Sequence, residues 1–380
     1  MSGVNVLIIG NGFDVYHKLE TRYIDFVRFV KSQSELDSGG EIESICKTNP
    51  FIKHFIDVID WETEEDKWID CEEEIKVIIS VFKKTFDAIQ RNDSRETYTG
   101  QEQQVIINFS KYFEDIEDVM NFYRYFREEY ERDFRKFEKK KLLSNIKSDL
   151  DDVITVLEYY LKDVCEEANI TKKSSQLLKT KFDFVVNFNY TDTYKLYDIE
   201  EENAFYIHGK LGKNPNNMVL GFSSKDEEQF RVEKSDVIYF EKYFQRIQKK
   251  LGVLDEERFL TFVNIGERKR GATTHFFGHS MSVSDGDIIE RIIEKLSDYV
   301  IIYYYDQVDY EEKVASLIEI LGKERMLGFV SNEIIQFVKI WDEETEGLLS
   351  MYREKSKADF QGLVFMDERK VKETINKYLG

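Results

Sequence analysis

Short apolar runs, most of them closed by a small or polar residue, recur at the start and in the second half of the chain. The first run, Val4–Ile9, is rich in β-branched residues and ends at Gly10. A strand that is buried on both faces of a parallel sheet has this pattern, so we predict that Val4–Ile9 is a central strand. With it, the further apolar runs predict up to six strands, at 182–188, 204–207, 218–220, 275–277 and 300–304.

Amphipathic stretches lie between several of these runs and predict helices. Apolar residues recur at helical spacing between Tyr23 and Val30, and again within 240–251 and 288–296. Helices that connect parallel strands cover both faces of the sheet, so the predicted fold class is α/β. In such folds the ligand binds at the carboxyl ends of the strands.

Two long regions carry a helical pattern without a convincing strand run. Residues 50–180 predict a large helical insertion, and 310–380 predict a helical C-terminal cap. The remaining ranges, 1–49 and 181–309, form the predicted discontinuous nucleotide-binding α/β domain. A prior of about 150 residues per domain allows this number of domains in a chain of 380 residues.

The net charge and the number and spacing of the cysteines indicate which partners and which cellular compartment to expect. With 74 acidic against 54 basic residues, the net charge of −20 repels nucleic acids and anionic membranes. The three cysteines are scattered and form no C-x-x-C pair, which suits a reducing compartment and argues against a structural zinc site. No signal peptide and no apolar run of about 20 residues is present. We therefore expect a cytoplasmic protein that binds no membrane. The net charge also argues against a nucleic-acid partner, although it leaves a local basic groove open.

The turn after the first strand has a composition that suits a nucleotide. Gly10 and Gly12 allow a tight turn and leave no side chain, so that a phosphate or ribose can approach the backbone amides. Val15 stands where the dinucleotide fingerprint has its third glycine, so a hydride-transfer dehydrogenase is not expected. Asn11 and Asp14 offer groups that bind ribose hydroxyls, although Asp14 could instead cap a helix. The alternative is a plain glycine turn.

Polar residues also follow the next two predicted strands. Asn189 and Asp192 come after the second strand and either bind a ligand or stabilise the turn. His208 ends the third strand and is followed by Gly209. A neutral imidazole can accept a proton at physiological pH, as a general base does. The alternative is a structural histidine.

A second glycine turn follows the run at 275–277. Gly278, His279 and Ser280 form this turn, and the hydroxyls and carboxylates of 284–287 follow it. These side chains can bind ribose, although 284–287 could instead be the N-terminal box of a helix. The histidines and aspartates of 275–287 fit no common spacing of metal ligands, so no metal site is predicted.

Several separated motifs follow one another along the chain: Gly10-Asn11-Gly12-Phe13-Asp14, Leu19-Glu20-Thr21-Arg22-Tyr23, Trp68-x-Asp70-x-Glu72, Phe188-Asn189-Tyr190-Thr191-Asp192-Thr193, Ile207-His208-Gly209, Leu220-Gly221-Phe222, Tyr243-Phe244-Gln245 and Phe277-Gly278-His279-Ser280. In these motifs the chain resembles the bacteriophage abortive infection AbiH family. The resemblance covers the chain from its start to about Tyr310. It implies an antiphage role, in which an infected cell is shut down before phage can spread.

A more remote resemblance is to the sirtuin-like domains of bacterial defence proteins, which bind and hydrolyse NAD. It implies a Rossmann-like sheet and assigns candidate residues: Gly10 and Gly12 under the pyrophosphate, Asn189 and His208 at the nicotinamide ribose, Gly278 and Ser280 beside the adenosine half, and Asn11, Asp14, Thr191, Asp192, Gly209 and His279 as further binding residues. The four-cysteine zinc module of the sirtuin deacylases is missing, which argues against protein deacylation.

The predicted function is that of a defence effector that hydrolyses NAD, its substrate, at the nicotinamide–ribose bond. The transition state resembles an oxocarbenium ion and the leaving group is already cationic, so neither a general acid nor a resident cofactor is required. His208 would act as the base, and Asn189 would orient the nucleophile. The alternatives are another nucleotide or nucleic-acid hydrolase, and a nucleotide-binding sensor without turnover. The helical regions are candidates for contact with a second copy or a defence partner.

Overall fold

The computed structural model describes residues 3–61, 69–90, 98–114, 131–170, 173–223, 237–251, 271–356 and 368–379. Contacts divide the chain into two compact units. The first unit consists of Met1–Leu19, Asn169–Ile207 and Val253–Gly380, and the second of Glu20–Ala168 and His208–Gly252. The domain boundaries drawn from the sequence stay predictions.

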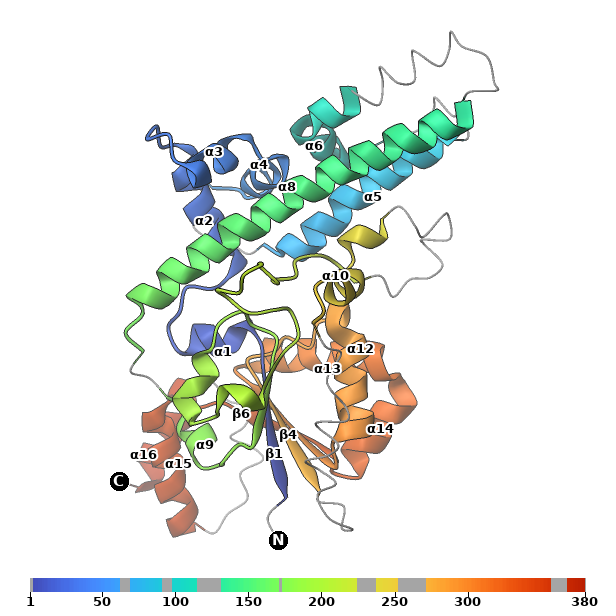
Figure 1. Ribbon diagram of the computed structural model, residues 1–380. Coiled ribbons are helices and arrows are strands. Elements are labelled where there is room, and N and C mark those ends of the chain that lie inside the picture. Colours follow the sequence, from blue (N-terminus) through green and yellow to red (C-terminus); the bar gives the residue numbers. More distant parts are fainter. Residues whose placement is uncertain are drawn as a thin grey trace. The chain divides into compact units, whose positions relative to one another are not determined.

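One parallel sheet forms the centre of the first unit, and the described residues contribute six strands to it (Figure 1). The strands are β1 (Val4–Ile9), β2 (Phe184–Asn187), β3 (Ala204–Tyr206), β4 (Ala272–Phe277), β5 (Tyr299–Tyr304) and β6 (Ile335–Lys339). Their spatial order is β3-β2-β1-β4-β5-β6. This is the doubly wound order of a Rossmann fold. Strands β1 to β3 follow one another in one direction across the sheet and β4 to β6 in the other, so the strand order reverses between β1 and β4. The predicted parallel α/β sheet with a central first strand is confirmed.

The register brings three strand ends to the same level. Ile9 lies opposite Asn187 on β2 and opposite Phe277 on β4. Gly10, Phe188 and Gly278 are the next residues along the three strands. The segments that follow β1, β2 and β4 therefore start side by side at one edge of the sheet.

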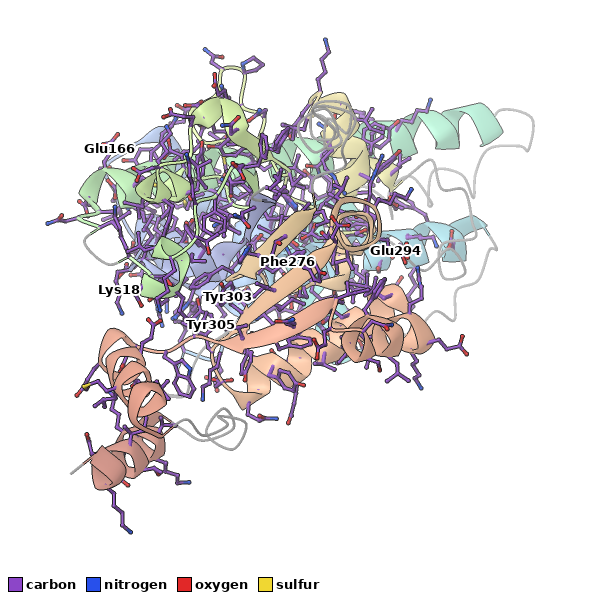
Figure 2. The ribbon with its side chains drawn as sticks, turned by 90° about the horizontal axis from the view of Figure 1, so that it is seen from below. Lys18, Glu166, Phe276, Glu294, Tyr303 and Tyr305 are labelled. Carbon is purple, nitrogen blue, oxygen red and sulfur yellow. The ribbon has the colours of Figure 1, made fainter. Side chains whose placement is uncertain are left out.

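Helices cover both faces of the sheet, as predicted. Val4, Val6 and Ile8 of β1 pack on the face that carries α12 (Gly286–Arg291), the π-helix η5 (Ile292–Leu296), α13 (Gln307–Leu321) and α14 (Lys323–Ser331). Leu7 and Ile9 pack on the opposite face against α1 (Asn11–Tyr16), α9 (Ser175–Leu178) and the 3₁₀ helix η1 (Thr193–Tyr197). Alternate residues of a strand point to opposite faces, which explains this division. Phe276 and Tyr303 likewise belong to the first and the second face (Figure 2).

Two strand predictions need correction. Residues 218–220 form no strand, because their backbone bonds to a loop and a side chain: Val219 N–H donates to the carbonyl of His208 at 2.8 Å, and Leu220 pairs with the amide of Gln245. The sixth strand is instead β6, which lies in the region predicted to be helical and pairs in parallel with β5. Gln336 and Lys339 interrupt its apolar pattern because β6 is an edge strand.

Most of the described residues of 50–168, which belong to the second unit, are helical, in agreement with the predicted helical insertion. The α-helices described in the second unit are α2 (Tyr23–Ser34), α3 (Glu41–Thr48), α4 (Pro50–Asp57), α5 (Cys71–Gln90), α6 (Gly100–Asn108), α8 (Glu131–Glu167) and α10 (Lys242–Gln248). Helices α2, α3, α4 and α8 pack on one another. The C-terminal helices α15 (Glu343–Ser356) and α16 (Glu368–Leu379) belong to the first unit and pack together through Leu349, Val371 and Ile375.

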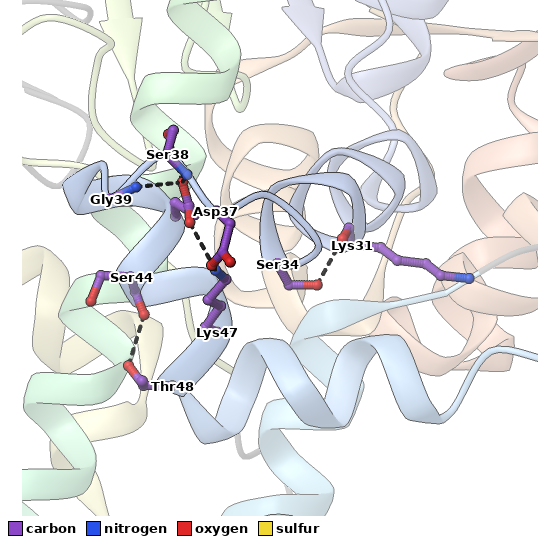
Figure 3. A network of polar contacts seen from close by, with 9 residues as sticks. Lys31, Ser34, Asp37, Ser38, Gly39, Ser44, Lys47 and Thr48 are labelled. Carbon is purple, nitrogen blue, oxygen red and sulfur yellow. Dashed lines mark hydrogen bonds and ion pairs between the residues drawn. The ribbon is translucent and has the colours of Figure 1, made fainter.

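A polar network fixes the connection between α2 and α3 (Figure 3). The carboxylate of Glu43 accepts hydrogen bonds from the hydroxyl and the backbone N–H of Ser38 and from the N–H of Gly39. Lys47 donates to Glu43 and to Asp37, at 2.8 Å each. Hydrogen bonds from Lys47 and Ser38 lower the pKa of Glu43 to about 2. The connection is thus held by a carboxylate that stays ionised in neutral and mildly acidic solution.

Candidate active site at the strand ends

Residues from the ends of β1, β2 and β4 meet in the first unit. The side-chain amide of Asn189 donates to the carbonyl of Gly10 at 3.0 Å, and the hydroxyl of Thr191 donates to Asp14 Oδ2 at 2.6 Å. A Cβ on Gly10 would lie 2.9 Å from the Cα of His279. We call this group of residues the strand-end cluster: Gly10, Asp14, Asn189, Thr191, Gly278 and His279. The fold thus brings together residues that lie far apart in the sequence.

The glycines of the two turns pack backbone against backbone. A Cβ on Gly278 would lie 2.0 Å from the nitrogen of Phe13, and Gly278 has a φ of +65°, which favours glycine. The N–H of Gly12 donates to the carbonyl of Gly278 at 2.8 Å, and the N–H of Phe13 donates to that of Gly10 at the same distance. Close packing of the turns thus requires these glycines. Their predicted place under a pyrophosphate stays a prediction.

Asparagines fix the segment that follows β2. The amide of Asn187 donates to the carbonyl of Thr191 at 2.7 Å, and its side-chain oxygen accepts from the N–H of Asn189 at 2.8 Å. This is the local bonding by which asparagine stabilises a turn. Asn187 therefore holds the loop, and the loop presents Asn189 and Thr191 to the residues after β1.

Asp14 is a buried carboxyl group with one oxygen bound and one left over. It lies inside α1, whose N-cap is Gly10, so the alternative of Asp14 as the N-cap is wrong. Its side chain is 1% exposed, and Oδ1 has no hydrogen-bond partner among the described residues. Burial raises the pKa of Asp14 to about 6, and the nearby donors of Thr191, Thr193 and Asn189 offset only part of that rise.

His279 is buried, and its contacts orient its ring. Its Nδ1 accepts a hydrogen bond from the N–H of Met281 at 3.0 Å, so the neutral ring carries its proton on Nε2. The ring meets Phe188 edge to face, with centroids 4.3 Å apart. His279 thus bridges the turn after β4 and the loop after β2.

The other predicted residues of the first unit lie at the rim of this region. Asn11, the first residue of α1, is exposed, and so is Ser280. Asp192 is half-buried, precedes η1 and pairs with Lys195. Its charge nevertheless contributes to the raised pKa of Asp14. Their contact with a ligand stays a prediction.

His208 and Gly209 belong to the second unit. The side chain of His208 is buried, and its carbonyl accepts from Val219. Gly209 has a φ of +88°, and a Cβ there would lie 2.2 Å from the carbonyl oxygen of Asn217. Gly209 is therefore required by the local backbone. The prediction that His208 shares a cleft with Gly10, Asn189 and Gly278 stays a prediction.

The remaining three histidines have structural surroundings. His17 donates from Nδ1 to the carbonyl of Phe13 at 2.6 Å and meets the hydroxyl of Tyr197 through Nε2. His54 bonds the carboxylate of Glu74 at 2.9 Å. Burial lowers the pKa of His275 to about 4, so this ring on β4 is neutral at physiological pH.

A buried ion pair connects residues in or next to several sequence motifs of the second unit. Lys242 of α10 is 1% exposed and lies 2.6 Å from Glu72 of α5, which also accepts from the hydroxyl of Tyr23 at 3.0 Å. Asp70 accepts hydrogen bonds from the N–H groups of Glu72 and Glu73 at the start of α5. These residues join three helices. Trp68, which the resemblance also includes, lies outside the described residues.

Sequence reasoning missed two side chains at this edge of the sheet. Tyr305 follows β5 (Figure 2). Its hydroxyl donates to the carbonyl of Gly12 at 2.9 Å. Thr193 donates to the hydroxyl of Thr191 at 3.2 Å. The position of Tyr305 after a predicted strand was a usable signal, and Thr193 ends one of the motifs that carry the family resemblance.

The described ranges contain neither a cluster of metal-binding side chains nor a helix that could cross a membrane. In those ranges no three His, Cys, Asp or Glu side chains gather closely enough to hold a metal ion. None of the helices described has the length and apolar character that a membrane crossing needs.

Comparison with known proteins identifies the family. The model of the family described as Bacteriophage abortive infection AbiH matches residues 6–306, which is most of the chain. The chain belongs to the AbiH family. Membership gives this AbiH protein a role in the abortive infection of bacteriophage. The matched range contains the whole strand-end cluster and ends just after β5, so β6 lies beyond it. No curated protein and no solved structure matches the chain.

Proposed function

We propose that this AbiH protein is an antiphage effector that binds NAD at the strand-end cluster and hydrolyses its nicotinamide–ribose bond. The observation that carries the proposal is the strand order. In a doubly wound sheet, ligands bind outside the carboxyl ends of the strands at the point where the order reverses. Here that point lies between β1 and β4, whose ends carry the two glycine turns.

The side chains of the strand-end cluster suit a polyhydroxylated ligand. Asp14, Asn189 and Thr191 offer a carboxyl, an amide and a hydroxyl group, and ribose hydroxyls bond to groups of this kind. The bond from Asn189 to Gly10 fixes the orientation of the amide before a ligand arrives. Preorganisation of this kind supports the role of Asn189 in orienting the nucleophile. The base predicted from the sequence is His208, and variants of this residue test that role.

The decisive experiment is to incubate purified protein with NAD, ATP and DNA and to follow the products by chromatography. The proposal expects nicotinamide and ADP-ribose from NAD, with ATP and DNA unchanged. Turnover of ATP or DNA alone would favour another hydrolase. Binding of NAD without products would favour a nucleotide sensor.

Two alanine variants locate the reaction. Asn189→Ala removes the orienting amide and is expected to lower kcat strongly. Asn332→Ala is the matched control, because the amide of Asn332 also donates to a backbone carbonyl, that of Gly328 at 2.7 Å, but is exposed at the C-terminal end of α14. Unchanged turnover in both variants would remove Asn189 from the mechanism.

His208→Ala separates a catalytic from a structural histidine. Loss of the base should lower the rate by roughly 10² to 10⁴ with an unchanged melting temperature. Loss of a buried structural group should instead lower the free energy of unfolding by about 1 to 3 kcal/mol. A fully active and normally stable variant would exclude both roles.

A further inference from the structure

One oxygen of the Asp14 carboxylate is fixed by a hydrogen bond, and the other has no partner among the described residues. Thr191 donates to Oδ2 at 2.6 Å, and Thr193 in turn donates to Thr191 at 3.2 Å. The backbone of Thr191 is itself held by Asn187. Catalytic bases are oriented by a further group in the same manner.

The second oxygen of Asp14 calls for a ligand. Oδ1 is enclosed and has no hydrogen-bond partner in the described part of the chain. A buried polar atom without a partner is costly, and such atoms in folded proteins are rare enough to need an explanation. A water molecule or a substrate hydroxyl next to Oδ1 would supply the missing donor. The site at which it would do so is the switch point of the sheet, where a ligand is expected.

The electrostatic surroundings of Asp14 are those of a base that works near neutral pH. Burial raises its pKa to about 6, and the charge of Asp192, from the loop after β2, adds to the rise. A base whose pKa lies close to the working pH combines a large ionised fraction with a useful proton affinity. The carboxylate is therefore ionised at pH 7 and still able to accept a proton.

We propose that Asp14 is the proton acceptor of the hydrolysis, an inference that rests on the proposed function. Oδ1 takes a proton from water while the water oxygen forms a bond to C1′ of the nicotinamide ribose. The bond from C1′ to the ring nitrogen breaks, and its electron pair stays on nicotinamide, which leaves as a neutral molecule. The products are nicotinamide, ADP-ribose and one proton, which Asp14 passes to solvent. In this mechanism His208 is not the base.

The test compares Asp14→Asn with wild-type protein and with Asp183→Asn. Asparagine keeps an oxygen for Thr191 but cannot accept the proton, so kcat should fall by roughly 10² to 10⁴ while NAD affinity stays within a few-fold. Asp183 is a matched control, because its carboxylate also accepts a hydrogen bond, from the N–H of Asn5, but at the start of β2. The Asp183→Asn variant should keep the activity of the wild type.

The pH dependence of kcat/KM in the wild type is a second test, and it needs no variant. The value of kcat/KM should rise with pH through an inflection near the pKa of Asp14, about 6. A flat profile across that range would overturn the inference, as would a fully active Asp14→Asn protein or one that no longer binds NAD. Absence of NAD turnover in the wild type would instead overturn the proposed function, and this inference with it.

Discussion

The negative charge of the Asp14 side chain destabilises the folded protein. Its pKa in the folded protein is about 6, above the ordinary value of 3.8, so the folded state binds the proton more tightly than the unfolded chain. The stabilisation from this proton is complete below about pH 4 and is lost as the pH rises through 6. At neutral pH the ionised carboxylate therefore lowers the stability of the protein.

Asp14→Asn should consequently stabilise the protein at pH 8 but not at pH 4. The shift of the pKa corresponds to about 3 kcal/mol, of which we expect the variant to regain about 1 to 3 kcal/mol in the free energy of unfolding. Urea unfolding of both proteins at the two pH values measures the difference. A variant that is less stable at pH 8 would show that the carboxylate supports the fold.

The strand-end cluster could be predicted from the sequence only in part. Asn189 and Gly278 were found because each follows an apolar run that ends in a turn. The bond from Thr191 to Asp14 joins residues 177 positions apart, so it depends on how β1 and β2 pair. No local pattern contains that information. Asp14 was accordingly selected as a residue that binds ribose or caps a helix, and its burial was not foreseen.

At the scale of elements, the two glycine turns hold the ends of β1 and β4 together. Gly278→Ala should unfold or strongly destabilise the protein, because the new Cβ would lie 2.0 Å from the nitrogen of Phe13 in a backbone conformation of positive φ. The matched control is Gly328→Ala on α14, where a Cβ meets no atom within 4 Å. There alanine should be neutral or stabilise by up to about 1 kcal/mol. Thermal unfolding compares the two variants.

The network at the α2–α3 connection predicts a response to acid. The pKa of Glu43 is lowered from 4.5 to about 2, so its contribution to stability is present above about pH 4.5 and is lost as the pH falls through 2. Glu43→Gln should lower the stability at pH 7, and the difference from wild type should shrink between pH 4.5 and pH 2. Exposed Glu35→Gln is the control, with no expected change. A constant difference over that range would exclude the carboxylate.

The strands show which patterns identify an element and which do not. Val4–Ile9 is predicted correctly because its length, its β-branched residues and the glycine that follows are typical of a strand buried on both faces. Residues 218–220 are equally apolar, yet their burial comes from a loop that bonds to Gln245. An edge strand such as β6 keeps polar residues, which conceals it among helices. An apolar run therefore indicates that residues are buried more reliably than it indicates whether they form a strand, a helix or a loop.

At the scale of the whole molecule, the family role makes a prediction in living cells. Bacteria that express the wild-type protein should release fewer phage after infection, and by the proposed function their NAD should fall before lysis. Cells with Asn189→Ala should keep their NAD and release phage normally, whereas cells with Asn332→Ala should behave as wild type. Phage counts and extracted NAD measure both outcomes. Protection with an undiminished NAD pool would separate the family role from the proposed chemistry.

The pairing of Ile9 with Phe277 has a consequence for the synthesis of the protein. The ribosome synthesises β1 first. This strand can pair with β4 only after most of the chain has been translated. Contacts between such distant segments form late in folding. A nascent chain, or a product of premature termination before Gly278, lacks Gly278 and His279 and so cannot complete the strand-end cluster. A host that produces this protein is therefore shielded, during translation, from any activity that requires the cluster.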